Sequence, residues 1–139
     1  MKKKLTHILL IDDDPATNFI NKKAIERLGC AEFTHITVNG KEAIDLLNKI
    51  RIDQFPELIL IDINMPIMNG WQFVEKYKTL FSKEKPASKL IILSTSQNPD
   101  DKEKSKSLEL VDGFENKPLT PIKLAKILEK HFPNLQELV

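Results

Sequence analysis

Short strand-like runs alternate with helical segments five times along this chain of 139 residues, and no Gly/Ser-rich or Pro-rich linker separates them. The predicted strands lie at residues 7–11, 33–38, 58–61, 90–93 and 113–116. The run LILI at 58–61 has no polar face, which is typical of a strand covered on both sides in a parallel sheet. Crossovers between parallel strands are almost always right-handed. Five such units therefore predict an α/β fold, a doubly wound five-stranded parallel sheet with helices on both faces.

Five helices are predicted between and after these strands, at residues 15–28, 39–50, 71–81, 98–110 and 120–132. In the first helix, Ile20, Ala24 and Leu28 recur at helical spacing, which predicts one buried stripe. The fourth helix is mostly polar, and its apolar anchors, Leu108, Leu110 and Val111, lie at its end. We therefore expect the fourth helix to be the least firmly packed of the five.

The composition excludes several classes of protein. The 21 Lys and Arg residues nearly balance the 20 Asp and Glu residues, which argues against a dedicated nucleic-acid binder. No stretch approaches the ~20 apolar residues of a membrane-spanning helix, so we expect a soluble, cytoplasmic protein that does not contact a membrane. Cys30 is the single cysteine, which excludes an internal disulfide and a thiolate metal cluster. The length suits one domain, residues 1–139.

Polar and charged side chains follow four of the predicted strands, at the point where each strand ends. They are Asp12, Asp13 and Asp14 after the first strand, Asp62 after the third, Ser94, Thr95 and Ser96 after the fourth, and Lys117 after the fifth. Ligands of doubly wound folds bind outside the carboxyl ends of the strands, so these side chains should share one edge of the sheet. Asp14 precedes Pro15 and is more simply interpreted as the cap of the first helix.

Clustered carboxylates at this edge would repel one another, by roughly 4 kcal/mol per pair at ~4 Å and an effective dielectric of ~20. A divalent cation or a lysine relieves this repulsion. Oxygen ligands without His or Cys select a hard metal, and a few carboxylates are the usual protein ligands of Mg²⁺. We therefore expect a Mg²⁺ site that involves Asp12, Asp13 and Asp62.

These residues carry a resemblance to a known family. The motifs are ILLIDDD at residues 8–14, LIDINMPIMNG at 60–70, LST at 93–95 and FENKP at 114–118. With these motifs the chain resembles the response regulator receiver domain, the CheY-like phosphoacceptor module of two-component signalling, over residues 5–132. The resemblance implies a flavodoxin-like sheet with strand order 2-1-3-4-5.

The resemblance also implies roles for the acidic residues. Asp62 matches the aspartate that is phosphorylated, and Asp12 and Asp13 match the acidic pair that holds Mg²⁺. Asn64 matches the position whose backbone carbonyl is a further metal ligand. The expected function is that of a phosphoacceptor in a phosphorelay, a signalling domain that assists only its own phosphorylation and dephosphorylation and is not otherwise an enzyme.

Three further positions match family residues that respond to the phosphoryl group, and two of them, Ser94 and Phe114, match the switch. Ser94 matches the hydroxyl that turns toward the phosphoryl group, Lys117 the ammonium that pairs with that group, and Phe114 the switch aromatic. Phosphorylation is then expected to shift the weakly packed segment 98–110, as a local charge change biases a two-state element.

The implied partners are proteins. A histidine kinase or a histidine phosphotransfer protein should supply the phosphoryl group, and an unidentified downstream protein should read it. Residues 133–139 are too few for an output domain, so we expect a stand-alone receiver that binds no nucleic acid.

Two other classes use similar residues. A Mg²⁺-dependent phosphatase with an aspartate nucleophile usually carries a second acid two residues after that nucleophile, where this chain has Asn64. A flavodoxin-like FMN-binding protein needs a Ser-, Thr- and Gly-rich phosphate loop after the first strand, where this chain has three aspartates. Incubation with acetyl phosphate and Mg²⁺ separates a receiver from both.

Overall fold

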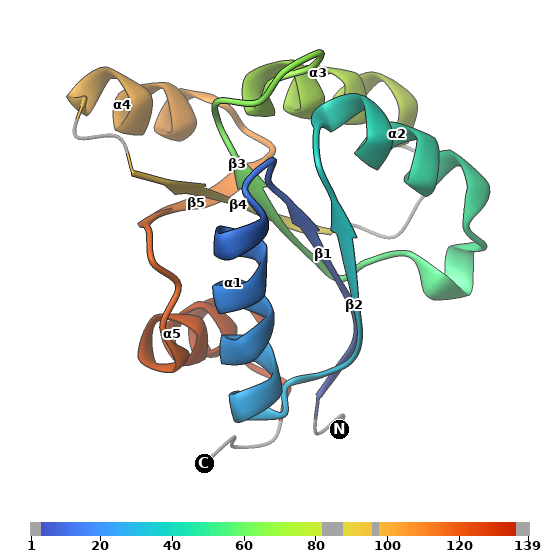
Figure 1. The fold of residues 1–139 in the computed structure, drawn as a ribbon, viewed down its shortest axis with the longest axis vertical. Coiled ribbons are helices and arrows are strands. Elements are labelled where there is room, and N and C mark those ends of the chain that lie inside the picture. Colours follow the sequence, from blue (N-terminus) through green and yellow to red (C-terminus); the bar gives the residue numbers. More distant parts are fainter. Residues whose placement is uncertain (1–3, 82–87, 96–97, 136–139) are drawn as a thin grey trace.

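A computed structural model describes residues 4–81, 88–95 and 98–135, and it shows a five-stranded parallel sheet in the order β2-β1-β3-β4-β5 (Figure 1). The strands are β1 (Leu5–Ile11), β2 (Ala31–Thr37), β3 (Leu58–Asp62), β4 (Lys89–Ser94) and β5 (Val111–Asn116). The helices are α1 (Pro15–Leu28), α2 (Gly40–Lys49), α3 (Gly70–Phe81), α4 (Pro99–Ser107) and α5 (Pro121–His131), with a short 3₁₀ turn η1 (Ile52–Gln54). The predicted fold class and strand order are confirmed. Ser96 lies outside the described residues.

The sheet separates two apolar cores, because successive side chains of a strand point to opposite faces. Leu9 of β1 joins Phe73 in the core beneath α2 and α3, whereas Leu10 joins Leu124 in the core beneath α1 and α5. Figure 1 shows the same division, with α1 and α5 together on one face of the sheet. Every residue of β3 is buried because it lies between β1 and β4 and is covered on both faces. Among the described helices, none has the length and apolar character needed to cross a membrane.

Helix α1 differs from the prediction at one position of its buried face. Ile20 was expected in the buried stripe, but its side chain is 47% exposed. The buried face instead carries Asn18, Asn21, Ala24 and Ile25. The buried apolar residues of α1, Ala24 and Ile25, lie in its C-terminal half, whereas the buried residues of the preceding turns are Asn18 and Asn21. Of the predicted stripe, Ala24 is buried and Leu28 packs partly buried against the core beneath α1 and α5, so only Ile20 was wrong.

Helix α4 ends earlier than predicted, at Ser107, and Leu108 is already extended. The expectation of weak packing is confirmed, because Ser105 is the one buried residue of this helix. Leu108 and Leu110 lie beyond the helix and pack only partly buried against the core on the α2 and α3 side.

Candidate functional site

Three carboxylates meet at the carboxyl ends of β1 and β3. Asp12, Asp13 and Asp62 each offer an oxygen, and these oxygens all lie within 4.8 Å of one another. Asp12 is buried and Asp62 is 9% exposed, whereas Asp13 is open to solvent. Parallel pairing of β1 and β3 explains the convergence, since Ile11 pairs with Ile61 and each strand continues directly into its aspartate.

Lys117 reaches this cluster from the end of β5. Its ammonium donates to Asp12 Oδ2 at 2.7 Å and to Asp62 Oδ1 at 3.0 Å. Its backbone N–H donates to the carbonyl of Ser94 at 2.9 Å, which fixes the start of the loop against the end of β4. The peptide bond between Lys117 and Pro118 is cis. One ammonium therefore bridges the two most buried carboxylates of the site.

The electrostatics follow from burial and from this bridge. Burial raises the pKa of Asp62, the hydrogen bond from Lys117 acts in the opposite direction, and the neighbouring Asp12 charge adds to the rise. Burial disfavours the Lys117 ammonium. The contacts with Asp12 and Asp62 outweigh that burial and raise the pKa of Lys117 above its usual value. Lys117 therefore stays charged at neutral pH.

The position of Asp12 is set by its neighbours in the chain. The backbone N–H of Asp14 donates to Asp12 Oδ1 at 2.9 Å, and the side-chain amide of Asn18 donates to the Asp12 carbonyl at 2.9 Å. Asp14 itself caps α1, because it accepts hydrogen bonds from the Ala16 N–H and the Thr17 hydroxyl. The prediction that Asp14 is a cap is confirmed. The contribution of Asn18 was not predicted, because an isolated Asn inside a helical pattern carries no signal.

The loop between β3 and α3 turns closely around Asp62. A Cβ on Gly70 would clash with the Asp62 carbonyl oxygen, and the Gly70 N–H donates to the Ile63 carbonyl at 2.8 Å. Asn64 is exposed. Ile67 has a φ of +69° and is 75% exposed, an unusual conformation for a β-branched residue. Only a glycine at position 70 lets the chain pass this close to the backbone carbonyl of Asp62.

The two predicted switch residues lie on the neighbouring strands. Ser94 is 3% exposed at the end of β4 and pairs with Asn116 of β5. Phe114 is partly buried and packs against the core on the α2 and α3 side. The structure thus brings Asp12, Asp62 and Lys117 into direct contact and places Ser94 one strand away.

The donor set fits a hard divalent cation. All three candidate ligands are carboxylates, and one of them, Asp13, is exposed, so a cation can reach the cluster from solvent. Such a ligand set with no nitrogen or sulfur favours Mg²⁺ or Ca²⁺ over zinc and copper.

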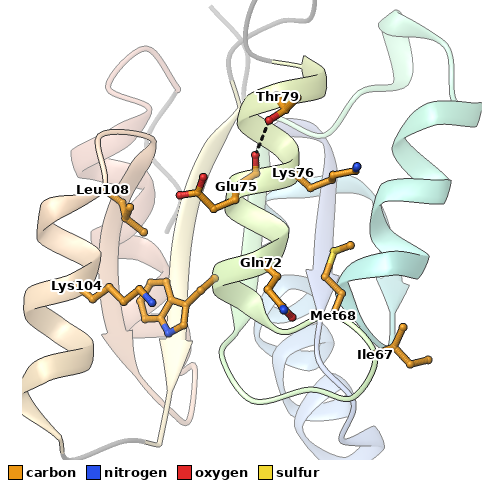
Figure 2. A pocket seen from close by; sticks show the side chains of 9 residues that line it. Ile67, Met68, Gln72, Glu75, Lys76, Thr79, Lys104 and Leu108 are labelled. Carbon is orange, nitrogen blue, oxygen red and sulfur yellow. Dashed lines mark hydrogen bonds between the residues drawn. The ribbon is translucent and has the colours of Figure 1, made fainter.

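A groove lies between α3 and α4 (Figure 2), and none of Asp12, Asp13 and Asp62 lines it. Its volume is about 550 Å³, and the residues that line it are Ile67, Met68, Trp71, Gln72, Glu75, Lys76, Thr79, Lys104 and Leu108. Lys104 of α4 lies over the indole ring of Trp71 at 5.0 Å from its centre. This contact ties the exposed face of α4 to α3.

The five-stranded parallel sheet and the acidic cluster at the carboxyl ends of its strands are the features of a receiver domain, a class of signalling domain. The chain matches the model of the response regulator receiver domain over residues 8–129, and it belongs to this family. It is 35% identical to two-component response regulator 24 of Arabidopsis thaliana, over 93% of this chain and 85% of that protein. Against the nitrate/nitrite response regulator NarL of Escherichia coli the identity is 30%, over 88% of this chain and 53% of that protein.

Solved structures agree with this assignment. A two-component response regulator from Cytophaga hutchinsonii superposes with a TM-score of 0.86 at 35% identity, over 94% of this chain and 99% of that one. The protein is therefore the receiver domain of a two-component response regulator, a signalling domain of the kind that works between histidine kinases and downstream effectors.

Proposed function

We propose that Asp62 accepts a phosphoryl group from a histidine kinase or a histidine phosphotransfer protein, with Mg²⁺ held by Asp12, Asp13 and Asp62. The observation that carries the proposal is the Lys117 ammonium, 3.0 Å from Asp62 Oδ1, beside two more carboxylates within 4.8 Å. Phosphoryl transfer needs positive charge beside the transferred oxygens, which the Lys117 ammonium and a metal ion held by these carboxylates would supply.

In the proposed reaction an Asp62 carboxylate oxygen attacks phosphorus in line. A P–O bond forms as the P–N bond to the donor histidine breaks, and the imidazole leaves with the electron pair and takes up a proton. Lys117 neutralises charge on the transferred oxygens from its place between Asp12 and Asp62. Mg²⁺, when bound by the acidic residues and the Asn64 backbone carbonyl, would neutralise the remaining charge.

The product is also the proposed signal. A phosphoryl dianion on Asp62 offers a strong acceptor to the Ser94 hydroxyl at the end of the adjacent strand. Movement of Ser94 would displace the loop between β4 and α4, and Phe114 of β5 would move with it. Helix α4 is the element expected to respond, since it buries a single residue.

Replacing the acceptor tests the chemistry directly. Asp62→Asn should take up no phosphoryl group from acetyl phosphate and Mg²⁺, whereas the wild type should gain one that is stable to acid and labile to alkali, as read by intact mass. Asp53→Asn is the matched control, because Asp53 is exposed and forms an ion pair with Arg51 at 2.6 Å, and it should label like the wild type. Labelling of Asp62→Asn at the wild-type level would exclude Asp62 as the acceptor.

The same incubation tests the alternative function. A phosphatase with an aspartate nucleophile would release phosphate over many turnovers from phosphomonoesters, whereas a receiver accumulates one phosphoryl group. Asn64 stands where such a phosphatase usually has its second acid, and it is exposed without a carboxylate to offer. This observation favours the receiver.

Trp71 is the single tryptophan of the chain and provides a probe of α4. If phosphorylation shifts α4, Lys104 should leave the indole ring, a contact worth about 0.5–1 kcal/mol, and the Trp71 emission should change. The change should be absent in Asp62→Asn and reduced in Lys104→Ala. Lys106→Ala, which alters an exposed lysine paired with Glu103, serves as the control and should respond like the wild type. An equal emission change in Asp62→Asn would show that phosphorylation does not drive it.

A further inference from the structure

Strand β2 forms an unpaired edge of the sheet. Among the described strands it pairs with β1 alone, at the opposite end of the sheet from β5 (Figure 1). An edge strand presents free backbone N–H and C=O groups, to which a further strand can add, and proteins usually prevent this with lysine, proline, a bulge or a short strand. β2 is seven residues long, reads AEFTHIT and shows no register shift against β1, so it has none of these features.

Strand β5, at the other edge, carries several of them. It contains Asp112, Gly113 and Glu115, and its pairing with β4 shifts register between Leu90 and Ile91. At this shift the Asp112 carboxylate accepts the Leu90 N–H at 2.9 Å. Acidic residues, glycine and an irregular register all make a strand a poor template for further pairing. The chain therefore protects one edge of its sheet and leaves the other open.

The open edge also exposes apolar side chains. Phe33 is 55% exposed, Ile36 is 42% exposed, and Val38, which directly follows the strand, is 44% exposed. A single exposed apolar side chain is normal on a protein surface. Three of them within residues 33–38, beside unpaired backbone groups, indicate an interaction surface.

The aromatic side chains of this surface are held in place by His7 of β1. The His7 ring stacks on Phe33 with centroids 5.0 Å apart and on His35 with centroids 5.1 Å apart, and its Nδ1 lies 2.9 Å from His35 Nε2. His7 is 6% exposed, so the row of three rings is anchored inside the sheet while Phe33 remains open to solvent. Because the rings are already ordered, association would cost little side-chain freedom.

We propose that β2 pairs antiparallel with β2 of a second copy of this chain, with the two-fold axis at Thr34, so that two sheets join into one. A two-fold axis requires a self-complementary surface, and the residues around Thr34 meet this condition. Phe33 of each copy lies opposite His35 of the partner subunit, so the aromatic row continues across the interface. The two Thr34 side chains face each other, a favourable pair in antiparallel sheets.

The charge of β2 agrees with this register. Glu32 is the one acidic residue of the strand, which has no lysine or arginine, and it lies opposite Ile36 of the partner subunit. The two Glu32 residues are then four positions apart along the paired strands, about 13 Å, which exceeds the screening length of about 10 Å at 0.1 M salt. No like charges face each other, and a second copy of the chain supplies the complement that the edge lacks.

The wild-type chain tests the interface without any substitution. A single pair of edge strands buries little area, so we expect dissociation in the micromolar range. In sedimentation experiments the mass should rise from 16.0 kDa toward twice that value as the unphosphorylated protein is concentrated toward millimolar. Amide hydrogen exchange in residues 31–37 should slow over the same range. A chain that stays monomeric, or a dimer that leaves this exchange unchanged, would exclude the interface.

Thr34→Lys and Thr34→Glu test the register. Each variant alone places like charges directly opposite at the axis, and its self-association should weaken roughly tenfold or more. An equimolar mixture brings opposite charges together, so mixed dimers should return, as read by native mass spectrometry. If both variants show the circular dichroism of the folded wild type and their mixture forms no mixed dimers, the axis does not lie at Thr34.

Two further variants complete the design. Phe33→Thr removes the ring and keeps a residue suited to a strand, so it should also weaken association, and wild-type association in this variant would contradict the proposal. Ile122→Lys alters a side chain of α5 that is 70% exposed and should dimerise like the wild type. Loss of the dimer in Ile122→Lys alone would refute the β2 interface.

None of these measurements requires phosphorylation. A chain that dimerises through β2 but takes up no phosphoryl group would retain the interface and refute the function assigned to Asp62. A chain that is phosphorylated on Asp62 but stays monomeric at every concentration would do the reverse.

Discussion

Lys117→Met is expected to destabilise the protein by about 3–5 kcal/mol at pH 7 in EDTA, because it leaves two buried carboxylates without their cation. The side chains of Asp12 and Lys117 are only 4% and 11% exposed, and that of Asp62 is 11% exposed, so solvent compensates the lost ammonium only in part. The measurement is a urea melt of each protein.

The stability lost in Lys117→Met should depend on pH, and the pKa of Asp62 sets the direction of that dependence. The pKa of Asp62 is already raised by burial, and removing Lys117 removes the hydrogen bond that opposes the rise. The folded variant therefore binds a proton at a higher pH than the unfolded chain does. Its stability increases relative to wild type as the pH falls from neutrality through the folded pKa of Asp62, and the deficit shrinks.

Lys123→Met is the matched control for Lys117→Met. Lys123 donates to the carbonyls of Asn116 and Pro118 in the same loop, but its side chain is 32% exposed. A cation with this exposure contributes about 1 kcal/mol or less. If both methionine variants lose the same stability, the contacts between Lys117 and the two aspartates do not stabilise the fold.

The convergence of Asp12, Asp62 and Lys117 could be predicted because it depends on topology. Each residue follows a strand whose apolar run is visible in the sequence, and parallel strands bring their carboxyl ends to one edge. The strand order followed from the family resemblance. Neither the convergence of the strand ends nor the strand order required knowledge of side-chain contacts.

The buried amides of α1 could not be predicted in the same way. Periodicity identifies a helix and its approximate apolar face, but it does not show which residues at the edge of that face are covered, and Ile20, expected to be buried, is exposed. Asn18 and Asn21 face inward because α1 begins at a polar edge, which depends on tertiary packing. The contact between Lys104 and Trp71 could not be predicted either, because surface pairs between different helices leave no pattern in the sequence.

Magnesium is expected to stabilise the wild-type protein against urea by about 2.7 kcal/mol at a hundred times its Kd, because the acidic cluster exists only in the folded chain. Asp13→Asn removes the exposed ligand and should lose most of this response. In EDTA the same variant should gain at most about 1 kcal/mol, since Asp13 is solvated and Lys117 already neutralises part of the cluster.

The design requires melts of wild type, Asp13→Asn and Asp53→Asn, each with EDTA and with millimolar Mg²⁺. Asp53→Asn removes an exposed aspartate that forms an ion pair with Arg51, and it should respond to Mg²⁺ like the wild type. Ca²⁺ should also shift the wild-type midpoint, because carboxylate oxygens distinguish the two ions only by size and geometry. A wild type whose midpoint does not move, or an Asp13→Asn variant that moves as far, would mean that Asp12, Asp13 and Asp62 do not form a metal site.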